Sequence, residues 1–391
     1  MDKYFLEDVQ EQIINNESLN FIAYAVIPLH VIGINAIIRY LNDNGYKLRG
    51  YIYIITHHTT GKHISENDFS IGNNLIKIYD GIIEFKNIRG IADKILTRLP
   101  FYNHYNCSKR RLFFAVPSPN YAINAITAKC NCVPHFIQYD DGYDSYVKRI
   151  KSLYEYKVMY TKNNSLVERV YSAIKSVAEG CSLELFIRRL KKNKLLTDFR
   201  MFSDNSIEVN PLSIKYYMDS FKNSYTGEFE EIRIFERCIL FNTQCLMENN
   251  ITDGKVDLEI YKEVVAIAKS IGCEVVVKPH PREHNVEKYI NMGCKVYAGK
   301  YTQESILASL RCCPSCIVSI HSSTLINAKG LFNIPVISLG RILLQRDISD
   351  LLRRQISDYI KQYSDIVLFP ESIEELTQII KVIVLNNSMS Q

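Results

Sequence analysis

The chain of 391 residues is 47% hydrophobic and 23% charged, which is typical of a folded soluble protein of two or three domains. Its 47 basic and 42 acidic residues give a net charge of only +5, which excludes the strongly basic surface of a nucleic-acid-binding protein. Among the eleven cysteines, the CxxC pair Cys313 and Cys316 has no mate at zinc-ligand spacing. We therefore expect reduced thiols in the cytoplasm, no metal site and no nucleic-acid partner.

The first residues lack a signal-peptide pattern, and one later segment, 20–38, approaches the length and hydrophobicity of a membrane span. Pro28, His30 and Gly33 interrupt this segment, so a strand, a turn and a helix explain it better. Alternating apolar strands and helices indicate a parallel sheet covered on both faces. In this first block the expected strands are 21–27, 51–58, 112–116 and 134–139, and the expected helices are 29–45 and 121–130.

A second alternating block follows a looser basic and tyrosine-rich stretch. Its expected strands are 237–246, 274–281, 315–321 and 334–340, and its expected helices are 258–272 and 322–332. Two such blocks predict an α/β protein with two Rossmann-like domains that face a central cleft. The predicted division is 1–155, an irregular helical connection over 156–230, and 231–391.

The first unusual strand end is Asp140-Asp141-Gly142. Ligands of open α/β sheets bind beyond the carboxyl ends of the strands, so polar residues there are candidates for chemistry. One aspartate could act as a general base while the other fixes the loop, and Gly142 would leave room for a substrate. The alternative is a solvent-facing turn, where Asp and Gly are common.

The second strand end is KPHPRE, 278–283, in which two prolines bracket His280 and restrict its backbone. Lys278 and Arg282 add positive charge, which suits a phosphate. The alternative is a histidine in an ordinary turn.

The third strand end runs into Ser322, Ser323 and Thr324 at the start of a helix. Hydroxyls and unpaired backbone N–H groups at a helix start form an anion site. The alternative is an ordinary helix N-cap, for which Ser and Thr are preferred.

In this order, DDG, HP and SS resemble the motifs of bacterial sialyltransferases. The chain is similar to the lipooligosaccharide sialyltransferases and, more closely in KPHPRE and SSTLINA, to the capsular polysialyltransferases. Segment 27–37 is also similar to the first strand–helix junction of these enzymes, so the resemblance spans about 20–340. It implies a GT-B fold with an acceptor-side N-terminal domain and a nucleotide-binding C-terminal domain.

The resemblance implies inverting transfer of sialic acid from CMP-sialic acid to a glycan hydroxyl, without a cofactor. Asp141 would deprotonate the acceptor, His280 would protonate or neutralise the leaving phosphate, and Asp140 and Gly142 would support the loop. The implied nucleotide and phosphate contacts are Lys278, Pro281, Arg282, Ser322, Ser323, Thr324, Thr243 and Gln244. The chain contains no D-x-D sequence, so we expect a metal-independent reaction.

Two other functions remain open at this point. CDP-glycerol-type polyol-phosphate transferases of cell-wall polymer synthesis share the HP and SS motifs but not the DDG pattern. A nucleotide-binding scaffold without catalysis is the alternative of another class. The acceptor is equally open, since an α2,3-linked cap on a lipooligosaccharide and an α2,8-linked capsular polymer need the same core chemistry.

A basic segment, FIRRLKKNKLL at 186–196, has three interpretations. It is a solvated helix face, a surface that meets the anionic inner leaflet of the bacterial membrane, or a track for an acidic glycan. A membrane contact would place the enzyme near a lipid-linked acceptor. We expect a cytoplasmic protein, with this peripheral contact as an open question.

Overall fold

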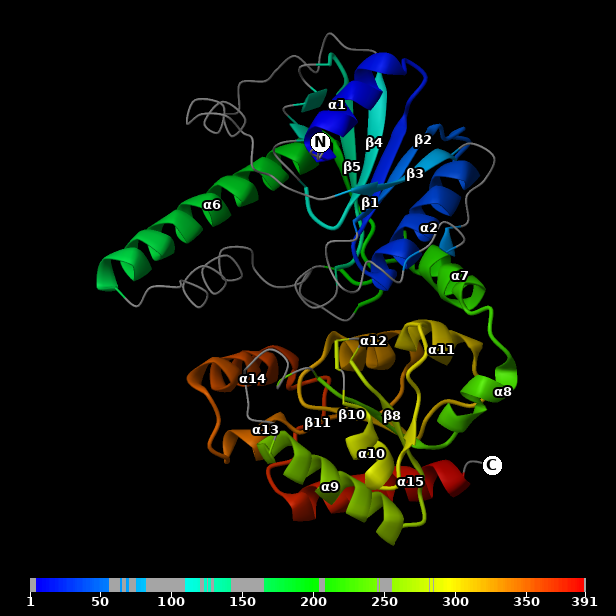
Figure 1. Cartoon of the computed structure of the whole chain (residues 1–391), viewed down its shortest axis with the longest axis vertical. Coiled ribbons are helices and arrows are strands. Elements are labelled where there is room, and N and C mark those ends of the chain that lie inside the picture. The colour runs from blue at the N-terminus through cyan, green and yellow to red at the C-terminus, as the bar shows by residue number, and fades with distance from the viewer. Residues whose placement is uncertain are drawn as a thin grey trace. The chain divides into compact units, whose positions relative to one another are not determined.

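The computed structural model describes residues 5–55, 64, 68–69, 75–81, 110–119, 123–124, 126–127, 130–141, 165–203, 208–244, 246, 255–280, 282–283 and 285–389. The chain forms two compact units, Met1–Ser220 and Phe221–Gln391, each built around its own sheet (Figure 1).

Unit 1 contains a six-stranded sheet of order β3-β2-β1-β4-β5-β6, in which the paired strands are parallel. Its strands are β1 (Phe21–Ala25), β2 (Gly50–Ile55), β3 (Leu75–Gly81), β4 (Arg111–Val116), β5 (Val133–Gln138) and β6 (Leu196–Asp198). Its helices are α1 (Phe5–Asn15), α2 (Pro28–Asp43) and α6 (Leu166–Lys192), and α7 (Ile214–Ser224) crosses the boundary between the units.

Burial on both faces explains the uninterrupted apolar strands of this sheet. Every residue of β1 is buried, as is most of β2. Gly50 begins β2 opposite Phe21, and a Cβ atom there would lie 1.8 Å from the Phe21 carbonyl oxygen. Only glycine permits this strand pairing.

Unit 2 contains a five-stranded sheet of order β11-β10-β7-β8-β9, again with parallel pairing. Its strands are β7 (Ile239–Asn242), β8 (Val275–Lys278), β9 (Lys295–Val296), β10 (Cys316–Ser319) and β11 (Val336–Ser338). Its helical elements are α8 (Phe229–Ile232), η4 (Arg233–Phe235), α9 (Lys255–Ser270), α10 (Glu287–Asn291), α11 (Gln303–Ser309), α12 (Ser323–Phe332), α13 (Gly340–Leu344), α14 (Asp350–Tyr363) and α15 (Ile373–Met389).

The predicted α/β class with two Rossmann-like parallel sheets is confirmed, and these are the two halves that a GT-B fold requires. The structure differs from the predicted three-part division in 156–230. This segment contains a regular helix of 27 residues, α6, and the strand β6, which pairs with β5 in the sheet of unit 1. Three residues are too short for a hydrophobic pattern to reveal β6 in advance.

Candidate functional site

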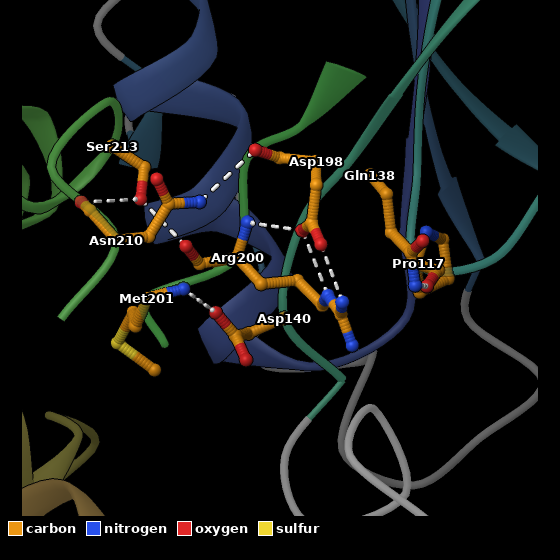
Figure 2. A network of polar contacts seen from close by, with 8 residues as sticks. All are labelled: Pro117, Gln138, Asp140, Asp198, Arg200, Met201, Asn210 and Ser213. Carbon is orange, nitrogen blue, oxygen red and sulfur yellow. Dashed lines mark hydrogen bonds and ion pairs between the residues drawn. The ribbon is translucent and has the colours of Figure 1, made fainter. Parts of the chain in front are cut away.

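The two aspartates that follow β5 lie in different surroundings. Asp140 is fully buried, and its carboxylate accepts a hydrogen bond of 2.5 Å from the backbone N–H of Met201 (Figure 2). Its own N–H donates to the Tyr217 hydroxyl at 3.1 Å. The Asp141 side chain, in contrast, is 44% exposed. This geometry is what the predicted roles require, since Asp140 anchors the loop and Asp141 is accessible; the roles themselves stay predictions.

The segment that holds Asp140 is itself fixed by a network of polar contacts. Arg200 forms a two-pronged ion pair with Asp198, at 2.8 Å from Nε and 2.5 Å from Nη2 (Figure 2). Ser213 donates to the Arg200 carbonyl at 2.6 Å, and Asn210 donates to the Asp198 carbonyl at 3.0 Å. The Met201 N–H that binds Asp140 therefore lies in a fixed stretch of backbone.

Asp141 has a partner that our sequence reasoning missed. His30, in the first turn of α2, places Nε2 2.6 Å from Asp141 Oδ1, and its side chain is only 3% exposed. The other ring nitrogen, Nδ1, accepts the N–H of Val26 at 3.2 Å. Because Nδ1 is an acceptor, the neutral ring carries its proton on Nε2 and donates it to the carboxylate. The signal was available, since His30 follows a strand predicted to end at the same sheet edge.

A close contact between α2 and the end of β5 positions this pair. Gly33 faces Tyr139 so closely that an added Cβ would lie 2.8 Å from Tyr139 Cβ and 3.0 Å from the Tyr217 hydroxyl oxygen. The Tyr139 hydroxyl donates to the Tyr24 carbonyl at 2.5 Å. Burial raises the pKa of Tyr139 and of Tyr217 well above the usual value, so both remain neutral hydroxyl groups.

In unit 2 the carboxyl ends of β10, β7 and β8 lie side by side in the sheet, and they carry the other predicted residues. Thr243 follows β7 and Lys278 ends β8. Burial lowers the pKa of Lys278, while the negative charge of Glu304 acts in the opposite direction.

His280 is held by its own backbone and by Thr243. Its N–H donates to Thr243 Oγ1 at 3.2 Å, and its Nδ1 accepts the N–H of Arg282 at 3.2 Å. The neutral ring therefore carries its proton on Nε2, as His30 does. The Thr243 hydroxyl also donates to Glu283, so it supports this loop; its predicted contact with the nucleotide stays a prediction.

Glu283, which the sequence analysis did not single out, anchors the loop that carries His280. Its side chain is 1% exposed. The carboxylate accepts from Thr243 and, at 2.5 Å, from the Tyr289 hydroxyl, and it forms a 2.6 Å ion pair with Lys288. A carboxylate with three partners is stable in a buried position and fixes the backbone around it.

The hydroxyl-rich start of α12 is a helix N-cap. Ser322 Oγ accepts the N–H of Thr324 at 3.2 Å, and the Ser322 carbonyl accepts from the Tyr359 hydroxyl at 2.8 Å. Thr324 Oγ1 accepts from the side-chain amide of Asn242 at 3.0 Å, which links α12 to the end of β7. The N-cap alternative is thus confirmed for Ser322; a role for Ser322, Ser323 and Thr324 in binding a phosphate stays a prediction.

Buried polar atoms collect at the same sheet edge of unit 2. Four of them have no hydrogen-bond partner among the described residues: Asn242 Oδ1, Gln244 Oε1, Ser319 Oγ and His321 Nδ1. Burial lowers the pKa of His321 to about 4, so its ring is neutral at physiological pH. Orphaned buried polar atoms in a native structure are normally completed by water or a ligand.

Two predicted residues, Gly142 and Pro281, lie outside the described residues. No three His, Cys, Asp or Glu side chains gather as metal ligands in the described part of the chain. None of the helices described there combines the length and apolar character that crossing a bilayer requires.

The apolar residues of the basic segment 186–196 are less exposed than a basic amphipathic surface would require. Leu190 and Leu195 belong to the core of unit 1, and Phe186 packs against that core. Arg188 is exposed and forms an ion pair with Glu184 at 3.4 Å. Leu185, directly before this segment, is exposed, and the other large exposed apolar residues of α6 lie nearer its first turn: Leu166, Val167, Val170, Tyr171, Ile174 and Val177.

Similar solved structures are distant in sequence. An α/β-galactoside α-2,3-sialyltransferase from Photobacterium phosphoreum is 15% identical with a TM-score of 0.47, over 91% of this chain and 98% of that one. A sialyltransferase from Photobacterium damselae is 14% identical with a TM-score of 0.41, over 90% and 100%. The UDP-GlcNAc 2-epimerase of Methanocaldococcus jannaschii is 12% identical with a TM-score of 0.44, over 94% and 92%. At these values the similarities carry no argument about the site.

Sequence comparison with families is more decisive. No curated protein matches the chain. The family model of alpha-2,8-polysialyltransferase (POLYST), however, matches residues 28–341, which include both sheet edges described above. The chain therefore belongs to the alpha-2,8-polysialyltransferase family and is a glycosyltransferase of the sialyltransferase class.

Proposed function

We propose that this enzyme transfers sialic acid from CMP-sialic acid to a hydroxyl group of an α2,8-linked sialic acid chain, with inversion at the anomeric carbon. The observation that carries the proposal is the exposed Asp141 carboxylate, which His30 holds at 2.6 Å. Asp141 takes the proton of the acceptor hydroxyl while that oxygen attacks the anomeric carbon. A single displacement of this kind inverts the configuration.

The bond between the anomeric carbon and the CMP phosphate breaks in the same step, and the phosphate takes the electron pair. The features that support a role for unit 2 in this half of the reaction are the Nε2 proton of neutral His280 and the cations Lys278 and Arg282. The N-terminus of α12, with Ser323, adds the partial positive charge of a helix start. Preorganised positive charge of this kind stabilises a leaving phosphate without a metal ion or a cofactor.

The unpaired atoms beside β7 and β10 suit the nucleotide. Asn242 Oδ1 and Gln244 Oε1 are acceptors, and the exocyclic amino group of cytosine is a donor. Because the chain belongs to a sialyltransferase family, the CDP-glycerol enzyme and the non-catalytic scaffold are set aside.

Purified enzyme tests the proposal directly. Incubation with CMP-sialic acid and a short α2,8-linked sialic acid acceptor should release CMP and lengthen the acceptor, as seen by anion-exchange chromatography. A galactose-terminated lipooligosaccharide acceptor should give little product. EDTA should leave the rate unchanged. Transfer only to the galactose acceptor would refute the α2,8 polymer, and a rate restored by a divalent ion after EDTA would refute the metal-independent reaction.

We also propose that α6 contacts the anionic inner face of the membrane, where a lipid-linked acceptor would lie. The exposed residues Leu166, Val170 and Ile174 recur at helical spacing on one side of α6, and its last turn carries Arg189, Lys191 and Lys192. Reversal of these three charges should weaken sedimentation with phosphatidylserine-containing vesicles and leave transfer to a short soluble acceptor unchanged. If vesicle binding stays the same and long products become shorter, the segment is a glycan track instead.

A further inference from the structure

The most informative contact outside the predicted residues is the one between His30 and Asp141. His30 is 3% exposed and Asp141 is 44% exposed, so a buried ring holds an accessible carboxylate. Their separation of 2.6 Å is short for a hydrogen bond from nitrogen to oxygen. A donor bound to an ionised acceptor gives such short and strong bonds.

The direction of this hydrogen bond is fixed by the backbone. The N–H of Val26, the first residue after β1, donates to His30 Nδ1 at 3.2 Å. This leaves Nε2 as the nitrogen that carries the proton of the neutral ring and points it at Asp141 Oδ1.

Both partners rest on the same rigid scaffold. His30 belongs to the buried first turns of α2, and its ring centroid lies 5.1 Å from that of Tyr139, two residues before Asp141. Gly33, one turn further along α2, allows the helix to pack directly on Tyr139. The relative position of His30 and Asp141 is therefore set by packing rather than by the exposed side chain alone.

We propose that His30 is a positioning residue for transfer, which holds the Asp141 carboxylate in the orientation that receives the acceptor proton. The inference rests on the proposed role of Asp141 as the base. In the reaction the proton passes from the acceptor hydroxyl to Asp141, the acceptor oxygen forms the new bond to the anomeric carbon, and CMP leaves with the electron pair. His30 keeps its own proton throughout and touches no substrate.

Two substitutions of His30, each with a side-chain amide that replaces a different ring nitrogen, test this proposal. In His30→Gln the side-chain amide lies where Nε2 lies, so it can still donate to Asp141. In His30→Asn the amide lies nearer to Nδ1, so the contact with Asp141 is lost. We expect kcat for transfer to fall about 10- to 100-fold in His30→Asn, the range for loss of a supporting partner, and only a few-fold in His30→Gln.

Two further measurements separate positioning from packing. The KM for CMP-sialic acid and the slow hydrolysis of CMP-sialic acid by water should change less than about two-fold in both variants. Should His30→Asn fail to fold, His30→Ala with added imidazole replaces it, and imidazole should then restore transfer. Equal losses in the Gln and Asn variants, wild-type kcat in His30→Asn, or no rescue by imidazole would overturn the inference. Full activity in Asp141→Asn would instead overturn the proposed base, so the two failures are distinguishable.

Discussion

The end of β5 in unit 1 and the end of β8 in unit 2 each present a side chain suited to proton transfer, but they support it differently. Asp141 is held by His30, which lies 111 positions earlier in the chain. His280 is held within its own loop by the Arg282 N–H and the Glu283 anchor, and Thr243 at the end of β7 adds a contact from 37 positions earlier. A short motif can thus contain most of the residues that hold its functional side chain, as after β8. It can also depend on a residue far away in the sequence, as after β5.

The two edges should also respond differently to substitution of their anchoring residues. At β8, the Glu283 carboxylate has three partners, so removal of one leaves two. After β5, anchoring and accessibility are divided between neighbouring residues: Asp140 holds the backbone, and Asp141 is exposed to solvent. Substitutions at the two edges should therefore separate activity from stability in unit 1 and affect both together in unit 2.

The largest expected effect is on activity in unit 1. Asp141→Asn keeps the shape of the side chain and an oxygen that accepts from His30, but it cannot take a proton. We expect transfer to fall by about 10²- to 10⁴-fold, the range for loss of a general base. The unfolding midpoint should stay within about 2 °C of wild type.

Asp140→Asn is the matched control for this prediction. Asp140 is buried and its carboxylate binds the Met201 N–H, so its substitution should lower stability more than Asp141→Asn does. If Asp141→Asn keeps transfer within a few-fold of wild type, the exposed carboxylate is not the base.

In unit 2 a single substitution should lower stability and activity together. Glu283→Ala leaves the charge of half-buried Lys288 and the hydroxyl of buried Tyr289 without their acceptor. We expect a loss of about 3 kcal/mol in the free energy of unfolding, the low end for a broken buried ion pair, measured by urea denaturation.

Glu283→Gln provides the control, because its one amide oxygen keeps an acceptor for either Thr243 or Tyr289, which the two carboxylate oxygens of Glu283 bind separately. It should lose less stability than Glu283→Ala and retain more transfer activity. Equal stability of wild type and Glu283→Ala would show that the loop carrying His280 does not depend on this carboxylate.

The sequence predicted the two sheets better than the contacts that support their edges. Alternating apolar strands and helices were enough for both parallel sheets, because strands buried on two faces must be apolar throughout. In KPHPRE the prolines and cations around His280 indicated this loop, but the anchoring role of Glu283 was not predicted. For the partner of Asp141, the sequence places His30 at the same sheet edge but does not say which strand end, 111 positions away, it will meet. The pairing of β6 with β5 was hidden because a strand of three residues has no readable hydrophobic pattern.

Acid should weaken both units, through partly buried His135 in unit 1 and partly buried His321 in unit 2. Burial lowers the pKa of His135 in unit 1 and of His321 in unit 2 to about 4. The unfolded chain binds these protons near the ordinary histidine value of about 6.5, so the unfolded state is favoured as the pH falls from about 6.5 to 4. At pH 5 each histidine should cost its unit about 2 kcal/mol, since one pKa unit corresponds to about 1.4 kcal/mol.

Urea unfolding followed by circular dichroism at pH 7 and pH 5 measures this loss. His321→Gln should make the stability of unit 2 less sensitive to pH and leave the response of unit 1 unchanged, while His135→Gln should do the reverse. The same acid response in wild type and both variants would place the proton uptake elsewhere.

The smallest expected effect tests the packing that connects α2 to the end of β5. Gly33→Ala places a Cβ 2.8 Å from Tyr139 Cβ, so the helix or the strand end must shift. Overpacking of this kind costs about 1–3 kcal/mol, and the better helix propensity of alanine returns nearly 1 kcal/mol, so the net loss of stability should be about 1 kcal/mol. Because His30 lies on the same helix, the shift should also move its ring relative to Asp141 and lower kcat several-fold.

Asn42→Ala, at an exposed position near the end of α2, is the control for helix propensity alone and should be neutral or slightly stabilising. If Gly33→Ala loses stability but keeps full kcat, the contact with Tyr139 maintains the fold without setting the geometry of the base, and the rigid support argued for His30 must come from Val26 instead.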